Sequence, residues 1–179
     1  MNKKNKAFTI VELLVAISII SIIALGANNI SFKSISDKQS LEIFNNKIIS
    51  EIERIRNNSL IGKGIGVNLD VPKTWRIDFS TSGSGVINTN YRLTDSSPWV
   101  LENSIPMEKF SINGVSCVDV NGTEHPLNNT QTGSIIFEGG KYRLSGTCLT
   151  TQGSLKINSF NRGYDYNIEF DVVSGIIKR

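Results

Sequence analysis

Residues 4–25 read KNKAFTIVELLVAISIISIIAL, and this stretch decides most of what the sequence predicts. Between residues 7 and 27 the only charged side chain is that of Glu12. A helix of this length measures about 30 Å, which matches the hydrocarbon core of a bilayer. The sequence therefore predicts a transmembrane helix that carries one charge near its start. A charge in a membrane segment is costly to bury, which indicates that Glu12 has a function.

The basic residues are unevenly placed along the chain. The sequence has 19 Lys and Arg against 16 Asp and Glu, a formal net charge of +3. Lys3, Lys4 and Lys6 precede the apolar run and account for the whole excess. Lysines on one side of a membrane segment hold that side in the cytoplasm. The pattern predicts a single-pass protein with a cytoplasmic N-terminus and an extracytoplasmic body, rather than a basic nucleic-acid surface.

A cleaved secretory signal and a plain membrane anchor are two alternatives for the apolar run. A secretory signal has a shorter apolar core and a small-residue cleavage site, and ALGANNIS (24–31) offers only a marginal site. A plain anchor fits the length of the run but gives Glu12 no role.

The heptapeptide KAFTIVE (6–12) resembles the cleavage and methylation motif of type IV prepilins and type II secretion pseudopilins. The resemblance implies that a prepilin peptidase cuts between Ala7 and Phe8 and that the new amine of Phe8 is methylated. The apolar segment is then retained, with Glu12 as the fifth residue of the mature chain. The family usually has glycine before the cut, and Ala7 departs from that pattern by one methyl group.

The resemblance also gives Glu12 a role in assembly. In the family this glutamate is thought to meet the N-terminal amine of a neighbouring subunit. Such a pair would offset the desolvation of both charges and penalise misaligned neighbours. The implied partners are other pilin or pseudopilin subunits, the peptidase and methylase, the membrane and an inner-membrane assembly platform. The alternative is a charge tolerated at the edge of the bilayer.

An amphipathic helix is predicted beyond the apolar run. Gly26, Asn28 and Asn29 weaken the helix between the two parts. GKGIG (62–66) is expected to end it, because glycine suits a helix C-cap. Apolar residues spaced by three and four form one stripe, which needs a sheet to pack on: Leu41, Phe44, Ile48, Ile52 and Ile55.

The rest of the chain predicts antiparallel strands. Short β-branched or alternating segments are separated by turn pairs such as NG and GG. Residues 121–133 are expected to be an exposed polar loop. The expected strands are 75–81, 86–93, 99–103, 107–112, 115–120, 134–137, 141–144, 154–158 and 166–173.

The predicted fold is α+β and resembles the pilin fold, with a long N-terminal helix packed on an antiparallel β-sheet body. The expected parts are a basic leader over 1–7, a transmembrane and assembly helix over 8–28, the amphipathic half of the helix over 29–62, and a β-rich domain over 63–179.

Three later segments resemble the GspH/FimT branch of minor pseudopilins: residues 48–69, 134–144 and 168–179. Members of that branch serve as structural minor subunits, and some bind DNA for uptake through basic residues near the C-terminal tail. The corresponding residues here are Lys178 and Arg179, a weak phosphate-binding signal. Three alternatives for the function therefore remain: a filament subunit, a DNA-binding minor pilin and a plain anchored surface protein.

Cys117 and Cys148 are the only cysteines. If the body is exported, a disulfide between them is expected, with a stabilisation of about 3–4 kcal/mol; the alternative is two buried thiols. The chain has one histidine, no CxxC pair and no phosphate-binding loop. No metal, cofactor or catalytic residue is expected, and the protein is not expected to be an enzyme.

Overall fold

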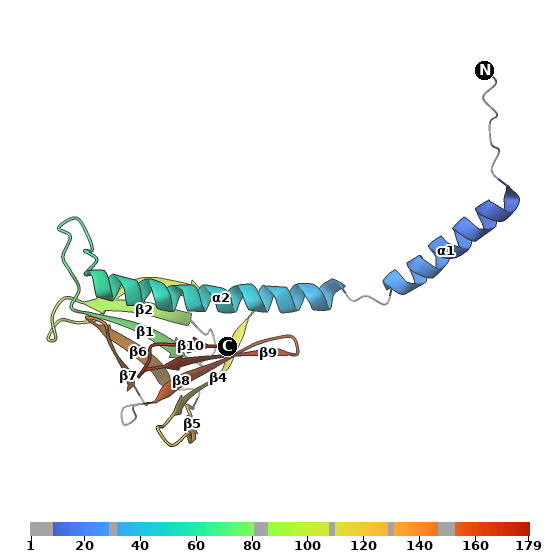
Figure 1. Ribbon diagram of the computed structural model, residues 1–179. Coiled ribbons are helices and arrows are strands. Elements are labelled where there is room, and N and C mark those ends of the chain that lie inside the picture. Colours follow the sequence, from blue (N-terminus) through green and yellow to red (C-terminus); the bar gives the residue numbers. More distant parts are fainter. Residues whose placement is uncertain (1–8, 29–31, 81–85, 108–109, 129–130, 147–152) are drawn as a thin grey trace. The chain divides into compact units, whose positions relative to one another are not determined.

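The structure is a computed structural model that describes residues 9–28, 32–80, 86–107, 110–128, 131–146 and 153–179. The chain divides into two compact units, Met1–Ser36 and Asp37–Arg179 (Figure 1). Helix α1 lies in the first unit and all the strands lie in the second. Helix α2 begins in the first unit and continues into the second.

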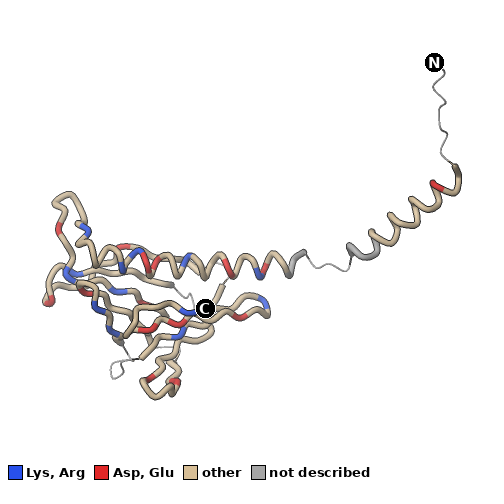
Figure 2. The backbone as a smooth tube through the Cα atoms, viewed as in Figure 1, with Lys and Arg blue, Asp and Glu red and all other residues tan. Residues whose placement is uncertain are grey.

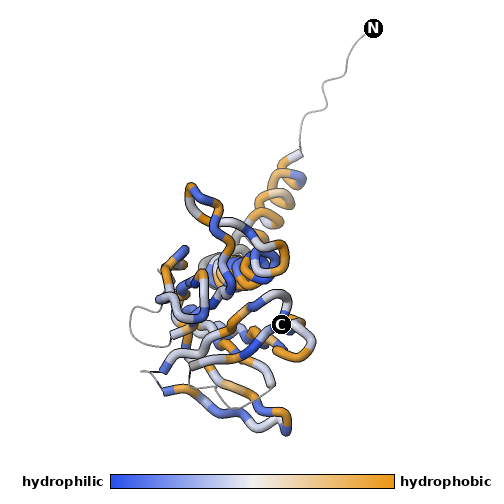
Figure 3. Tube along the Cα trace, turned by 90° about the vertical axis from the view of Figure 1, so that its left-hand side faces the viewer, coloured by the Kyte–Doolittle hydropathy of each residue, from blue (hydrophilic) through white to orange (hydrophobic). Residues whose placement is uncertain are grey.

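Helix α1 (Ile10–Asn28) consists mostly of apolar residues and has no separate polar face. It is predominantly orange in Figure 3. Glu12 is its only charged residue (Figure 2). A helix without a polar face needs an apolar environment or partner helices around it. Its exposed large side chains are Ile10, Val11, Leu13, Leu14, Val15, Ile17, Ile19, Ile20, Ile22 and Ile23. Within the described residues, no helix meets the combined requirement of length and apolar character for crossing a membrane.

Helix α2 (Phe32–Ile61) confirms the predicted apolar stripe. All five stripe residues are at most 5 % exposed, with Ile52 and Ile55 fully buried. The helix ends as predicted, because Gly62 takes a left-handed φ of 64° and lets the N–H of Lys63 reach the carbonyl of Asn58 at 3.0 Å. That 6→1 bond is the Schellman C-cap, in which glycine avoids the steric cost of the left-handed residue.

The strands form two antiparallel five-stranded sheets. The first has the order β3-β2-β1-β6-β7 and the second has the order β10-β9-β8-β4-β5. The bounds in the first sheet are β1 (Thr74–Ser80), β2 (Val86–Arg92), β3 (Val100–Pro106), β6 (Thr132–Glu138) and β7 (Lys141–Gly146). The bounds in the second are β4 (Ser111–Val118), β5 (Glu124–Pro126), β8 (Ser154–Asn161), β9 (Tyr164–Asp171) and β10 (Ile177–Lys178).

Two of the local predictions are wrong. The expected strands 107–112 and 115–120 are a single strand, β4, because the Asn113-Gly114 pair forms a register irregularity opposite β8 instead of a turn. The expected loop 121–133 contains the short strand β5 and the start of β6. The remaining expected strands are confirmed where the structure describes them, with ends shifted by a few residues.

The core of the second unit lies between α2 and the inner faces of both sheets (Figure 1). Inward side chains alternate with outward ones along β1 and β8, as expected for strands with one buried face. The largest fully buried side chains come from α2 and from both sheets, and include Ile52, Trp75, Phe79, Phe137, Ile157 and Phe170. The predicted packing of the amphipathic helix on a β-sheet body is therefore confirmed.

Candidate functional site

The N-terminus of α1 is capped by three reciprocal hydrogen bonds between Thr9 and Glu12. The backbone N–H of Thr9 donates to Glu12 Oε2 at 3.0 Å, and its hydroxyl donates to the same oxygen at 2.9 Å. The backbone N–H of Glu12 donates to Thr9 Oγ1 at 3.3 Å. This is a capping box, in which an N-cap Thr and an acid three residues later satisfy each other's backbone donors.

The capping box adds a residue that the sequence interpretation missed. Thr9 has no role in the resemblance to prepilins, although the pattern Thr-x-x-Glu before an apolar run indicates a helix start. The two hydrogen bonds that Thr9 donates both end on Oε2 of Glu12. The other carboxylate oxygen, Oε1, accepts no hydrogen bond from a described residue. The predicted cleavage residues Ala7 and Phe8 lie outside the described residues.

The two serines of α1 satisfy their hydroxyls within the helix. Ser18 Oγ donates to the carbonyl of Leu14 at 2.8 Å, and Ser21 Oγ donates to the carbonyl of Ile17 at 2.8 Å. A hydroxyl that bonds the carbonyl four residues earlier needs no outside partner. These serines therefore do not prevent α1 from packing in apolar surroundings.

An ion network fixes α2 to the edge of the first sheet. Arg54 bonds Glu51 through two nitrogens at 2.7 and 2.8 Å, and Glu102 of β3 through two bonds at 2.5 and 2.8 Å. Glu51 Oε1 also accepts from Thr89 Oγ1 at 2.9 Å and Asn103 Nδ2 at 3.1 Å. Burial of Glu51 opposes its charged form, but the bonds from Arg54, Asn103 and Thr89 outweigh this and lower its pKa. The hydrogen bonds that Arg54 donates to Glu102 and Glu51 raise the pKa of its guanidinium.

The C-terminal tail is ordered as strand β10, which pairs with β9. Lys178 Nζ lies 3.9 Å from Glu169 Oε1 and 3.9 Å from Asp171 Oδ2. Two carboxylates this close reduce the positive potential that Lys178 presents to a phosphate. Arg179 is exposed. The nearby carboxylates therefore disfavour a DNA-binding site at Lys178 and Arg179. That site stays a prediction.

Cys117 lies in the core, 3 % exposed, and is not a free thiol. Cys148 lies outside the described residues, so the Cys117–Cys148 pair stays a prediction. Within the part of the chain that the structure describes, no group of three or more His, Cys, Asp or Glu side chains is arranged to hold a metal ion.

Comparison with known proteins bears on the N-terminal segment. The family model described as the prokaryotic N-terminal methylation motif matches residues 2–28. No curated protein and no solved structure gives a significant match to the chain. The matched range contains the predicted cut at Ala7–Phe8, the capping box and the whole of α1. The motif supports a type IV pilin-like or pseudopilin subunit, and the two helices and two antiparallel sheets are compatible with a pilin fold.

Proposed function

We propose that the protein is a minor pilin or pseudopilin, a filament subunit that carries out no catalytic turnover. The match of residues 2–28 to the methylation motif carries this proposal. A prepilin peptidase removes residues 1–7 by cutting between Ala7 and Phe8, and the amine of Phe8 is methylated. Before assembly the chain is a single-pass membrane protein with its N-terminus in the cytoplasm.

The character of α1 supports assembly through this helix. Its side chains are apolar around the whole circumference, and its two serines bond their own backbone. Such a helix is stable when surrounded by other apolar helices, as in the core of a filament. Glu12 pairs with the Phe8 amine of a neighbouring subunit through Oε1, which the capping box does not use.

The finer proposal is the GspH/FimT-like branch of minor subunits, in a type IV pilus or a type II secretion pseudopilus. The resemblance of residues 134–144 and 168–179 supports this branch. In the structure these residues hold the β6–β7 hairpin and the last strands, β9 and β10. We do not extend the proposal to DNA uptake, because Lys178 lies beside Glu169 and Asp171.

The mass of the mature chain tests the proposal directly. The full chain is expressed in membranes together with a prepilin peptidase and purified, and its intact mass and N-terminal sequence are measured. We expect a chain that begins with N-methyl-Phe8. A chain that keeps Met1, or one cut after about residue 20 as a secretory signal would be, contradicts the proposal.

Variants at Ala7 provide the matched controls. A tight subsite before the cut admits only a small side chain, so Ala7→Gly is processed at least as fast as the natural chain. Ala7→Leu stays uncut while it still inserts into the membrane. Equal processing of all three chains would show that the cut does not depend on this residue.

A further inference from the structure

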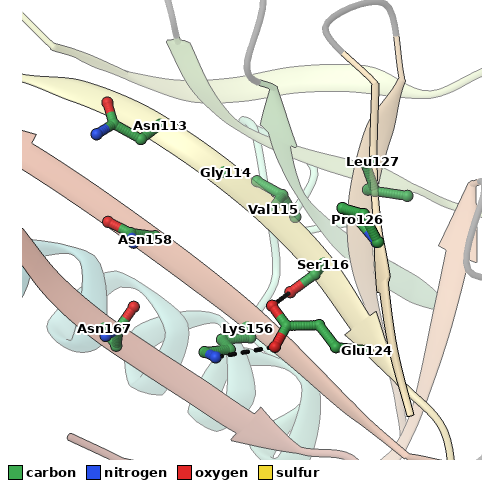
Figure 4. A pocket seen from close by; sticks show the side chains of 10 residues that line it. All are labelled: Asn113, Gly114, Val115, Ser116, Glu124, Pro126, Leu127, Lys156, Asn158 and Asn167. Carbon is green, nitrogen blue, oxygen red and sulfur yellow. Dashed lines mark hydrogen bonds and ion pairs between the residues drawn. The ribbon is translucent and has the colours of Figure 1, made fainter.

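A polar cleft opens on the outer face of the second sheet, far along the sequence from the methylation motif. Its volume is about 300 Å³, within the range of small-ligand sites. Asn113 of β4, Asn158 of β8 and Asn167 of β9 line one side, each on a different neighbouring strand (Figure 4). The strand pairing brings them together, because Asn158 is opposite both Gly114 and Asn167.

Asn158 presents unused hydrogen-bonding capacity at this cleft, whereas Asn113 Oδ1 already accepts a hydrogen bond from Ser111 Oγ at 3.1 Å. Asn158 Oδ1 is buried and accepts no hydrogen bond from a described residue. A buried acceptor without a partner is costly, so it marks a place where a ligand donor would be stabilised. Each amide can both donate and accept, which matches groups that also do both.

The charges of Lys156 and Glu124, the two charged residues that line the cleft, cancel each other. Lys156 Nζ lies 3.0 Å from Glu124 Oε2, and Ser116 Oγ donates to Glu124 Oε1 at 2.6 Å (Figure 4). The hydrogen bond from Ser116 and then the pairing with Lys156 lower the pKa of Glu124, so the carboxylate stays charged at neutral pH. A neutral ion pair offers little net attraction to a phosphate or a cation. The ligand that fits is therefore uncharged.

We propose that this cleft binds a neutral glycan chain, with hydroxyl groups held by the amides of Asn113, Asn158 and Asn167. Neighbouring strands lie about 4.8 Å apart, so the paired residues Asn158 and Asn167 are separated by about the length of one pyranose unit, and Asn113 lies on the next strand beside Gly114. Pro126 and Leu127 line the other side and provide an apolar surface for sugar C–H groups (Figure 4). This inference does not depend on the proposed filament role.

An extended peptide fits this place less well. Peptides that join a sheet use the free backbone groups of an edge strand. The cleft lies over β4, β8 and β9, of which β4 and β8 are paired on both sides and β9 is paired with β8 and β10. Recognition must therefore come from side chains on the face of the sheet, where the amides lie.

The test uses the full chain, labelled with ¹⁵N in asparagine, in micelles of a zwitterionic detergent without a sugar headgroup. The probes are glucose, N-acetylglucosamine and the β-1,4-linked trimer of each, and a capped neutral tripeptide is the comparison. We expect a trimer to shift the side-chain amide signals of the three cleft asparagines in a saturable way. We expect it to bind at least tenfold more tightly than its monosaccharide. The absence of a saturable shift with every sugar overturns the proposal, and so does tighter binding of the tripeptide at these signals.

Two variants separate binding from folding. Asn158→Leu keeps the branched shape and the number of heavy atoms of the side chain and removes both polar groups, so we expect at least a tenfold loss of trimer affinity with an unchanged or raised Tm. Asn88→Leu makes the same substitution at a half-buried position of β2 in the other sheet, and should leave trimer binding unchanged. If Asn158→Leu lowers the Tm and keeps the affinity, the residue is structural and the proposal is wrong.

Discussion

Arg54 of α2 and Glu102 of β3 form a two-point ion pair, with Nη2–Oε2 at 2.5 Å and Nη1–Oε1 at 2.8 Å. The two residues are 48 positions apart in the sequence. The same guanidinium holds Glu51 one turn earlier on the helix. This arrangement joins the surface of the helix to the outermost strand of the first sheet, beyond the reach of the apolar stripe. The orientation of α2 on the sheet therefore depends on a polar contact as well as on the core.

The first prediction concerns the loss of this contact. Arg54→Met leaves Glu51 and Glu102 without their cation, so we expect the free energy of unfolding to fall by about 1–2 kcal/mol in urea titrations. The estimate is modest because the Arg54 side chain is 32 % exposed and solvent screens part of the interaction. Glu53→Gln is the control, since its pair with Arg56 spans 3.5 Å at the surface. If Arg54→Met lowers the free energy of unfolding no more than Glu53→Gln does, the Arg54 ion network does not stabilise the fold.

The second prediction is a pH dependence that comes from Glu51. Its pKa is lowered in the folded protein, so its contribution to stability is present above the unfolded value near 4.5 and is lost as the pH falls through the folded value. We expect the stability difference between the natural chain and Glu51→Gln to shrink as the pH is lowered from 7 toward 3. Urea unfolding of both chains over this range measures it. A difference that stays constant with pH means that the charge of Glu51 contributes nothing.

The sequence predicts those parts of this fold that depend on neighbours along the chain. The stripe from Leu41 to Ile55 is periodic, and the cap at Gly62 follows it directly. The position of β6 between β1 and β7 has no such signal, because its pairing with β1 is not local. The three cleft asparagines come from three strands, so only the strand register brings them together. Thr9 and Glu12 carry the Thr-x-x-Glu pattern of a capping box, but the resemblance to prepilins assigns Glu12 an intersubunit role instead.

The third prediction concerns the close approach of β6 to the second sheet at Gly133. A Cβ placed there would lie 2.7 Å from Val115 Cγ1 and 3.0 Å from Leu155 Cδ1. Overpacking of this kind typically costs about 1–3 kcal/mol, so Gly133→Ala should lower the Tm and the unfolding free energy. Gly114→Ala is the matched control in β4, because a Cβ at that position meets nothing within 4 Å. Equal stability of the two variants would rule out the close approach.

The fourth prediction tests the capping box. Thr9→Val removes the hydroxyl that accepts a hydrogen bond from the N–H of Glu12 and donates one to the Glu12 carboxylate. We expect this loss to destabilise the start of α1 by about 1 kcal/mol. We expect faster amide hydrogen exchange in the first turn, measured on the full chain in micelles, with no change in the second unit. Thr9→Ser keeps the hydroxyl and should behave as the natural chain. Unchanged exchange in Thr9→Val would mean that the cap is not formed.

The last prediction separates the two uses of the Glu12 carboxylate. Glu12→Ala removes the acceptor for Thr9 and also the charge proposed to meet a neighbour's amine, whereas Glu12→Gln keeps an acceptor oxygen and loses the charge. If the charge directs assembly, both variants insert and are cut at Phe8, but neither enters filaments when expressed with the other subunits. If the cap alone matters, Glu12→Gln assembles and Glu12→Ala does not. Cell fractionation, intact mass and the subunit content of sheared filaments measure the three steps, and normal incorporation of Glu12→Ala would refute both roles.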